Sequence, residues 1–186
     1  MTEYTINSSG AVVPAKGGTQ SILITMTADE FRDNRSDFPF HREMLHSLGS
    51  IRYCKAELYK NCVIGTMRIP RKEAQRAPEL CFGFCLTDKT LHIIEDTGEY
   101  KALVARLVKH SSGAARPSQL LLRLLELLTE NDVPYMMHIE TELERMEDEL
   151  GQKPGDDFFR RLTRHRQKLS ELGAYYGQLS DIGERL

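Results

Sequence analysis

The first half of the chain alternates short apolar segments with turn-forming residues, a pattern typical of strands separated by short helices. Branched apolar residues fill 21–26, which predicts a strand. Directly after it, Thr27 and Glu30 have the spacing of a capping box, so a short helix is expected to begin at Thr27. A second helix is expected to follow 37–40 and to end at Gly49.

Strand patterns then return, and they predict the fold class. Segments 55–59 and 62–69 are rich in β-forming residues. Residues 80–86 are apolar on both faces, which is typical of a central strand covered on both sides. A turn at 88–89 should return the chain into 90–94, so these last two strands should form a hairpin. Strands interspersed with helices predict an α/β sandwich with a mixed sheet.

The second half of the chain has helical periodicity. Thr97 is the expected N-cap of a helix that ends at 111–113. Residues 118–150 contain no glycine and would form about 50 Å of helix at 1.5 Å per residue. Their first part, 120–128, is apolar nearly all round and should pack against the sheet. Pro134 should kink or interrupt the helix. Beyond it lies a narrow apolar seam, made by Met136, Ile139, Leu143, Met146 and Leu150.

A turn at 151–155 precedes a second long helix, expected from about Asp157 to the end, so the two helices should form an antiparallel hairpin. The apolar positions of this second helix are Leu162, Leu169, Leu172, Tyr176, Leu179, Ile182 and Leu186. Segment 118–150 holds nine acidic residues, whereas 160–168 holds five basic and no acidic ones. The two charged faces should therefore lie side by side. The predicted organisation is a sandwich domain over 1–117 and a helical hairpin over 118–186.

The acidic helix has two interpretations. It is either a solvated face matched to its basic neighbour, or a surface that raises the local concentration of divalent cations, because hard cations prefer carboxylate oxygens. Exposed ion pairs contribute only about 0.2–1 kcal/mol each, so the apolar seam is expected to supply the stability of the hairpin.

Composition excludes several classes of function. The 25 basic and 27 acidic residues give a net charge of −2. A net charge of this sign does not favour binding to nucleic acid or to an anionic membrane. The chain contains no apolar run of about 18 residues, the length that a membrane-spanning helix needs. The start of the chain does not have the pattern of a signal peptide, so the cytosol is the expected compartment and the cysteines are expected to be reduced.

No residue pattern points to catalysis. The four cysteines, at positions 54, 62, 81 and 85, form no CxxC motif. Cys81 and Cys85 would lie about 13 Å apart on one strand, too far to share a metal ion or a disulfide. Packing in the core is therefore the expected role of the cysteines. Only His138 and Glu142 have the i,i+4 spacing of two ligands on one helical face, and a solvated pair is the favoured interpretation. The sequence has no phosphate-binding loop, nucleophile elbow or HExxH motif, so no enzymatic activity is expected.

Five features of the sequence belong together: an acidic helix at 139–150, a turn with Pro154, a basic helix at 165–172, a His-containing helix at 41–45 and a Lys-x-Glu segment at 55–59. In these features the chain resembles the cytoplasmic domain of the CorA family of divalent cation transporters, and the likeness extends over roughly 38–186. The Gly-Met-Asn motif of the outer pore mouth is absent.

The resemblance implies an αβα sandwich with a mixed sheet, followed by two antiparallel helices. In the family a stalk helix and two transmembrane helices come next, and the subunits form a pentamer around a pore. None of these last segments is in the sequence, so the chain is expected to be a soluble cytoplasmic piece of a longer protein, attached to the membrane only through the missing helices.

The resemblance also implies metal ligands. Family members are regulated by magnesium bound between cytoplasmic subunits, and Glu126 and Glu130 match an acidic position at the start of the long helix. The partner acid on the stalk lies outside this chain. At another regulatory position His46-Ser47 replaces an acidic pair, which removes two hard oxygen ligands and better suits a softer ion such as zinc.

Two functions from different classes follow. The first is the cytosolic regulatory domain of a CorA-like transporter of magnesium or another divalent cation, which does not transport by itself and works as a homo-oligomer on the cytoplasmic side of the cell membrane. The second is a free-standing cytosolic adaptor that uses its helical hairpin to dock a partner helix. No firm cofactor is expected, and the ligand that the resemblance implies is Mg²⁺ or another divalent cation. No nucleic acid partner is expected.

Overall fold

A computed structural model of the chain describes residues 1–16, 20–34, 38, 40–72, 79–96, 100–111, 116–151 and 154–185. Its strands form one seven-stranded sheet in the order β2-β1-β3-β7-β6-β5-β4. The strands are β1 (Thr2–Ile6), β2 (Val12–Pro14), β3 (Leu23–Met26), β4 (Lys55–Tyr59), β5 (Cys62–Ile69), β6 (Leu80–Thr87) and β7 (Leu91–Ile94). The helices are α1 (Ala28–Asp33), α2 (His41–Leu48), α3 (Tyr100–His110), α4 (Pro117–Thr129), α5 (Asp132–Leu150) and α6 (Phe158–Gly183).

The sheet is mixed, as predicted. Strand β3 runs parallel to β7, with Leu23 beside Leu91, while every other described pairing is antiparallel. Strands β6 and β7 form the expected hairpin, in which Phe84 lies opposite Ile93. Strand β6 lies between β7 and β5 and is buried along most of its length, which confirms the prediction of a central strand covered on both faces.

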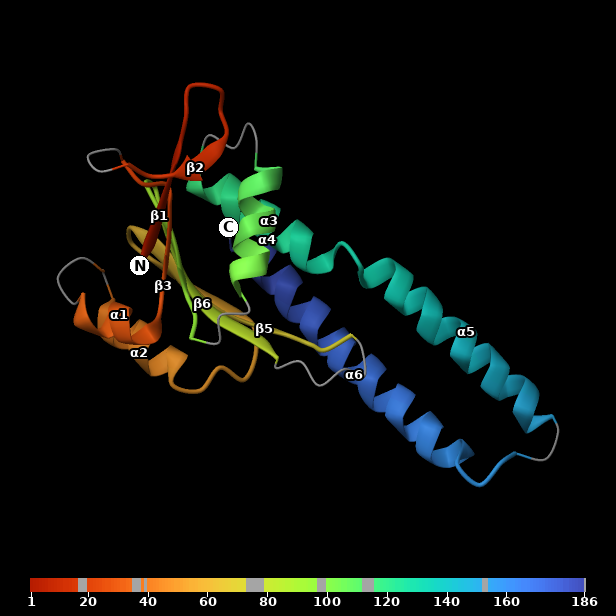
Figure 1. Ribbon diagram of the computed structural model, residues 1–186. Helices are drawn as coiled ribbons and strands as arrows, with labels where there is room; N and C mark the ends of the chain where they lie inside the picture. Colours follow the sequence, from red (N-terminus) through yellow and green to blue (C-terminus); the bar gives the residue numbers. More distant parts are fainter. Residues whose placement is uncertain are drawn as a thin grey trace.

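Helices cover both faces of the sheet, so the fold is the predicted αβα sandwich (Figure 1). One layer contains α1 and α2, whose buried Phe31 and Met44 pack with Ile64 and Cys85 of the sheet. The other layer contains α3 and α4, whose leucines pack with the side chains on the opposite face of the strands. Long, fully apolar strands such as β6 require this double cover because neither face can be left to water.

The first helices begin and end where the sequence predicts. Thr27 caps α1 with a capping box, since its hydroxyl accepts from the Glu30 amide at 3.1 Å and Glu30 accepts from the Thr27 amide at 2.9 Å. Helix α2 ends at Gly49, whose amide donates to the carbonyl of Leu45 at 3.2 Å. Parts of the predicted 37–40 lead-in, the expected cap Thr97 and residues 112–113 lie outside the described residues.

The long helix predicted over 118–150 is interrupted, but the interruption is not at Pro134. Helix α4 ends at Thr129 and α5 begins at Asp132, so the break falls on Glu130 and Asn131. Pro134 is the third residue of α5. Its missing amide costs nothing there, because the first-turn amides of a helix have no partner within the helix. Proline therefore fixes where the second helix can start.

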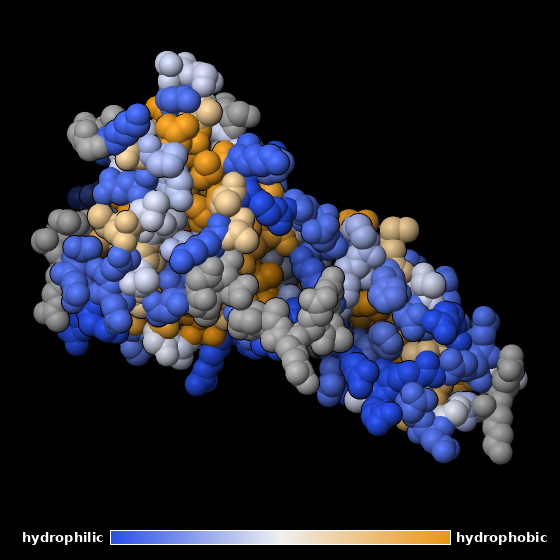
Figure 2. Space-filling view, in the orientation of Figure 1, coloured by the Kyte–Doolittle hydropathy of each residue, from blue (hydrophilic) through white to orange (hydrophobic). Residues whose placement is uncertain are grey.

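Helices α5 and α6 form the predicted long antiparallel hairpin, which projects from the sandwich (Figure 1). The seam differs from the predicted one. Ile139 and Met146 are buried, but Met136 and Leu150 are 36% and 56% exposed, and on α6 Leu162 is 39% exposed. Only one side of the predicted apolar seam therefore faces the partner helix. Hydrophobic side chains remain visible among the charged ones on the surface of the hairpin (Figure 2).

The acidic face of α5 and the basic face of α6 also contact each other less than predicted. Among the described residues one ion pair joins the two helices, between Arg161 and Glu149. The other ion pairs of the hairpin stay within one helix, such as the pair of Arg145 with Glu142. The exposed charges therefore add little to the stability of the hairpin.

Helix α4 packs on the sheet, so in the structure the hairpin itself consists of α5 and α6; the division predicted at 117/118 stays a prediction. None of the described helices is both long enough and apolar enough to cross a membrane.

Gly65, in the middle of β5, offers a test of the packing of the sheet. A Cβ at this position would collide with the carbonyl oxygen of Lys55 and with the ring of Phe84. The substitution Gly65→Ala should lower the free energy of unfolding by about 1–3 kcal/mol, because the backbone neighbour cannot move aside. Urea unfolding measures the change. The control Leu58→Ala removes an exposed side chain from the adjacent strand and should change stability by less than about 0.5 kcal/mol. Equal effects would contradict the close approach.

Candidate functional site

The two carboxylates predicted to bind metal lie at the end of α4. Both Glu126 and Glu130 are exposed and come one helical turn apart. Each already has an arginine partner, since Glu126 pairs with Arg123 and Glu130 pairs with Arg106 of α3. A cation bound there would have to displace both guanidinium groups, because each neutralises the carboxylate that the cation needs.

The described residues contain no group of three or more His, Cys, Asp or Glu side chains placed to hold a metal ion. His138 is exposed, while its predicted partner Glu142 pairs with Arg145 instead. His46 is exposed on α2. A site at Glu126 and Glu130 therefore requires further ligands from another subunit or another segment.

The cysteines lie where core packing predicts. Cys54, Cys62 and Cys85 are buried, Cys81 is half-buried, and all four are free thiols. Burial raises the pKa of Cys85 to about 12, so this thiol stays protonated at neutral pH. A protonated, buried thiol is a poor nucleophile and a poor metal ligand.

A cluster of polar groups around Asp132 fastens the hairpin to the sandwich. Asp132, the first residue of α5, is 5% exposed. Its carboxylate pairs with the ammonium group of Lys72 and accepts a hydrogen bond of 2.8 Å from the hydroxyl of Tyr176 on α6. Lys72 also donates to the carbonyl of Leu128 at 2.9 Å, one of the orphan carbonyls at the end of α4. Three segments distant in the sequence therefore meet at one carboxylate.

This contact perturbs the tyrosine. Burial and the hydrogen bond to Asp132 both raise the pKa of Tyr176 well above its ordinary value, so Tyr176 acts as a donor at every physiological pH. The buried carboxylate therefore has a cation and a neutral donor, which is the arrangement that a buried charge needs.

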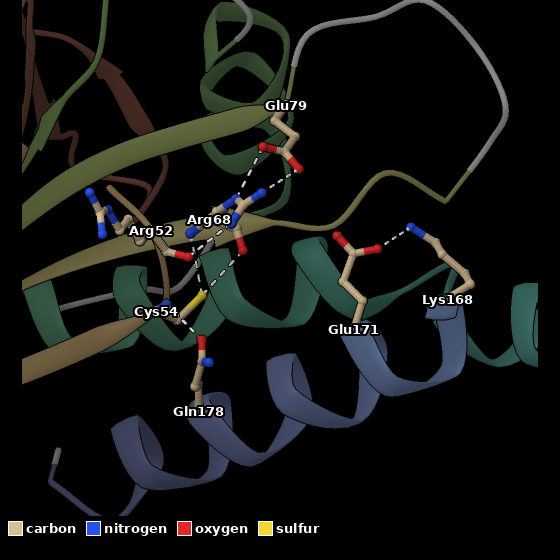
Figure 3. A network of polar contacts seen from close by, with 7 residues as sticks. All are labelled: Arg52, Cys54, Arg68, Glu79, Lys168, Glu171 and Gln178. Atoms are coloured by element: carbon tan, nitrogen blue, oxygen red, sulfur yellow. Dashed lines mark hydrogen bonds and ion pairs between the residues drawn. The ribbon is translucent and has the colours of Figure 1, made fainter. Parts of the chain in front are cut away.

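A second network holds the later part of α6 against the edge of the sheet (Figure 3). The amide of Cys54 donates to the side-chain oxygen of Gln178 at 2.8 Å. Nearby, the guanidinium of Arg68 makes two hydrogen bonds of 3.0 Å to Glu79 and one of 3.0 Å to the carbonyl of Arg52. The paired carboxylate raises the pKa of Arg68. The bond between Cys54 and Gln178 joins α6 to the sheet, and the bonds of Arg68 hold the neighbouring segments at 52 and 79 in place.

Sequence reasoning did not find either network. A signal was present in Asp132, because an acidic residue in the first turn after a helix break is favourably placed against the helix dipole. Its partners are 60 and 44 residues away, and local periodicity cannot pair residues across such distances.

A family model for the CorA-like Mg²⁺ transporter protein matches residues 34–186. The chain belongs to this family. The CorA-like family is one of transporters and not a class of enzymes. No curated protein matches the sequence.

Two solved structures share the CorA-like fold of this chain. The full-length CmaX protein aligns with a TM-score of 0.70 and 13% identity over 98% of this chain. The cytoplasmic domain of ZntB from Vibrio parahaemolyticus RIMD 2210633 aligns with a TM-score of 0.69 and 11% identity over 99% of this chain and 78% of the other. The chain spans 61% of the CmaX chain. At these identities the likeness establishes the fold.

Removal of the carboxylate of Asp132 tests the junction. The substitution Asp132→Asn should lower the free energy of unfolding by about 3–5 kcal/mol, because it leaves the half-buried Lys72 ammonium without a counter-charge. The double variant Asp132→Asn, Lys72→Met should recover much of the loss, since it removes both charges. Chemical denaturation measures both. The control Asp148→Asn changes an exposed acid of the same helix and should have little effect, and an equal loss there would contradict the role given to Asp132.

Proposed function

We propose that this chain is the cytoplasmic regulatory domain of a divalent cation transporter, with magnesium as the expected ion. The observation that carries the proposal is the family match over residues 34–186, together with an αβα sandwich and long hairpin shared with the cytoplasmic domain of ZntB. In this proposal the 186 residues do not move ions themselves, and they work on the cytoplasmic side of the membrane as part of a longer polypeptide.

The proposed regulatory signal is a divalent cation bound between subunits of a homo-oligomer, a pentamer by likeness to the family. Glu126 and Glu130 are the proposed ligands from this chain, because they present two exposed carboxylates on one flank of α4. The arginines that hold them, Arg123 and Arg106, give the site two states. Without the ion the carboxylates pair within the subunit, and with the ion they turn to the interface.

The second candidate is a free-standing adaptor that docks a partner helix on the hairpin. The exposed apolar side chains Met136 and Met137 on α5 favour it, because such side chains on a charged helix are typical of a helix-binding surface.

The coding sequence downstream of Leu186 separates the two candidates. The transporter proposal expects the reading frame to continue for about 100 residues and to contain two apolar runs of about 20 residues each, the length that spans a bilayer. Sequencing the gene gives the answer. A stop codon directly after Leu186 would overturn the transporter proposal and favour the adaptor.

The metal ligands are tested by thermal unfolding of the chain with and without Mg²⁺ at millimolar concentration, and with Zn²⁺ and Co²⁺ at micromolar concentration. Binding to the folded state raises the midpoint by mass action, and a concentration of 100 times the dissociation constant stabilises by about 2.7 kcal/mol. The double variant Glu126→Gln, Glu130→Gln should lose the rise, whereas the control Asp181→Asn, an exposed acid on α6, should keep it. An unchanged rise in the double variant would remove both residues from the proposed site.

A further inference from the structure

A small polar cavity lies where α6 meets the edge of the sheet. It measures about 130 Å³, close to the roughly 150 Å³ of a cavity that admits benzene and far more than one water molecule needs. Its lining includes Arg52, Arg68, Glu171, Tyr175 and Gln178. Glu171 and Gln178 project from α6 toward the strand that carries Arg68 (Figure 3). The cavity therefore has room for a molecule of several non-hydrogen atoms.

One side chain that lines this cavity, Tyr175, has an unused donor. The residue is only 2% exposed, and its buried hydroxyl has no hydrogen-bond partner among the described residues. The adjacent Tyr176, by contrast, donates to Asp132 at 2.8 Å. A buried hydroxyl without a partner destabilises the folded state, so such groups are rare in native proteins. Burial raises the pKa of Tyr175 well above its ordinary value, so the hydroxyl keeps its proton and can donate to an oxygen atom in the cavity.

Two further side chains of the lining carry donors of their own. The side-chain oxygen of Gln178 accepts from the amide of Cys54 at 2.8 Å, which leaves the NH₂ group of Gln178 to donate elsewhere. Arg52 is exposed, and no described carboxylate forms an ion pair with it. A guanidinium group offers five N–H donors in a planar fork, which matches the oxygens of a carboxylate or a phosphate group. The lining is therefore rich in donors.

The charges around the cavity leave one cation without a counter-charge. Arg68 is matched by Glu79, which accepts two hydrogen bonds of 3.0 Å from its guanidinium group. Glu171 is matched by Lys168, at 3.0 Å. Among the described lining residues the positive charge of Arg52 is then in excess. Water can satisfy a hydroxyl, but only an anion supplies both an acceptor and the missing negative charge, and hydrogen bonds between charged groups are the stronger ones.

We propose that this cavity binds a small oxyanion, that is, a carboxylate or a phosphate group. Its oxygens accept from the hydroxyl of Tyr175 and from the NH₂ group of Gln178. The exposed side chain of Arg52 turns toward the bound anion and supplies the counter-charge. The anion thus joins the segment before β4 to α6, beside the existing bond between Cys54 and Gln178.

This site goes beyond the proposed transport role and does not depend on it. The proposed cation ligands, Glu126 and Glu130, lie at the end of α4, and neither lines the cavity. A ligand held between Arg52 and α6 adds a contact between the sandwich and the hairpin. Because such a ligand binds the folded chain and not the unfolded one, it stabilises the base of the hairpin.

Thermal unfolding of the 186-residue chain tests the site at constant ionic strength, with chloride replaced stepwise by acetate or by inorganic phosphate. Binding should raise the midpoint in a saturable way. A rise with acetate alone identifies a carboxylate site, and a rise with phosphate alone identifies a phosphate site. Equal midpoints in all three salts overturn the proposal and leave the cavity to water. Phosphate also stabilises proteins generally, because it is excluded from their surface, so variants must locate the effect.

The variant Tyr175→Phe removes the unused hydroxyl and keeps the ring. In chloride it should leave the midpoint unchanged or raise it, because a buried group without a partner is lost. It should nevertheless raise the dissociation constant of the oxyanion by about tenfold, the effect of losing one hydrogen bond to a charged group. A variant that binds the anion as tightly as the unchanged chain overturns the role of Tyr175.

The charge is tested by Arg52→Gln, which should raise the dissociation constant by about tenfold or more, since it removes the counter-charge of the anion. The control Arg160→Gln removes the same charge from an exposed position at the start of α6, outside the lining, and should leave the dissociation constant unchanged. Circular dichroism verifies that each variant is folded. Equal losses of affinity in Arg52→Gln and Arg160→Gln would show binding to the general surface charge and overturn the proposal.

Discussion

The leucines of α4 pack against the sheet, and this packing fixes the position at which the hairpin of α5 and α6 starts. Leu120, Leu121 and Leu124 are fully buried, and each buried leucine contributes roughly 1.5–3 kcal/mol relative to an exposed one. A helix held so firmly places the carbonyl of Leu128, in its last turn, at a fixed position beside Lys72. The start of the hairpin is therefore as well defined as the core of the sandwich.

The junction at Asp132 extends this rigidity into the hairpin. The buried carboxylate of Asp132 binds both Lys72 and Tyr176, so all three segments must be in place for these contacts to form. The contacts therefore stabilise one orientation of α5 relative to the sandwich. Farther out, the hairpin has one described ion pair between its helices and a seam of few buried side chains. Its tip is therefore expected to open more readily than its base, because local stability follows buried apolar contacts.

The exposed carboxylates show why charge count alone is a poor guide to metal sites. The segment 118–150 is strongly acidic, yet Glu126 and Glu130 each lie against an arginine and Asp132 lies against a lysine. Three other acids of α5, Glu140, Glu144 and Glu147, border the open groove between α5 and α6. Their position suits them to attract a basic surface as well as a free cation.

The sequence by itself determined the layers of this protein: apolar runs predicted the strands, the capping box at Thr27 predicted α1, and leucines on every side of 120–128 predicted a helix pressed on the sheet. These features are local, because periodicity and caps depend on residues within a few positions of each other. Only the tertiary structure decided that the helix breaks before Pro134, that Met136 faces a groove instead of the seam, and that Asp132 is the fastening point. Each of these depends on contacts between segments tens of residues apart, whose geometry follows from how the packed layers fit together.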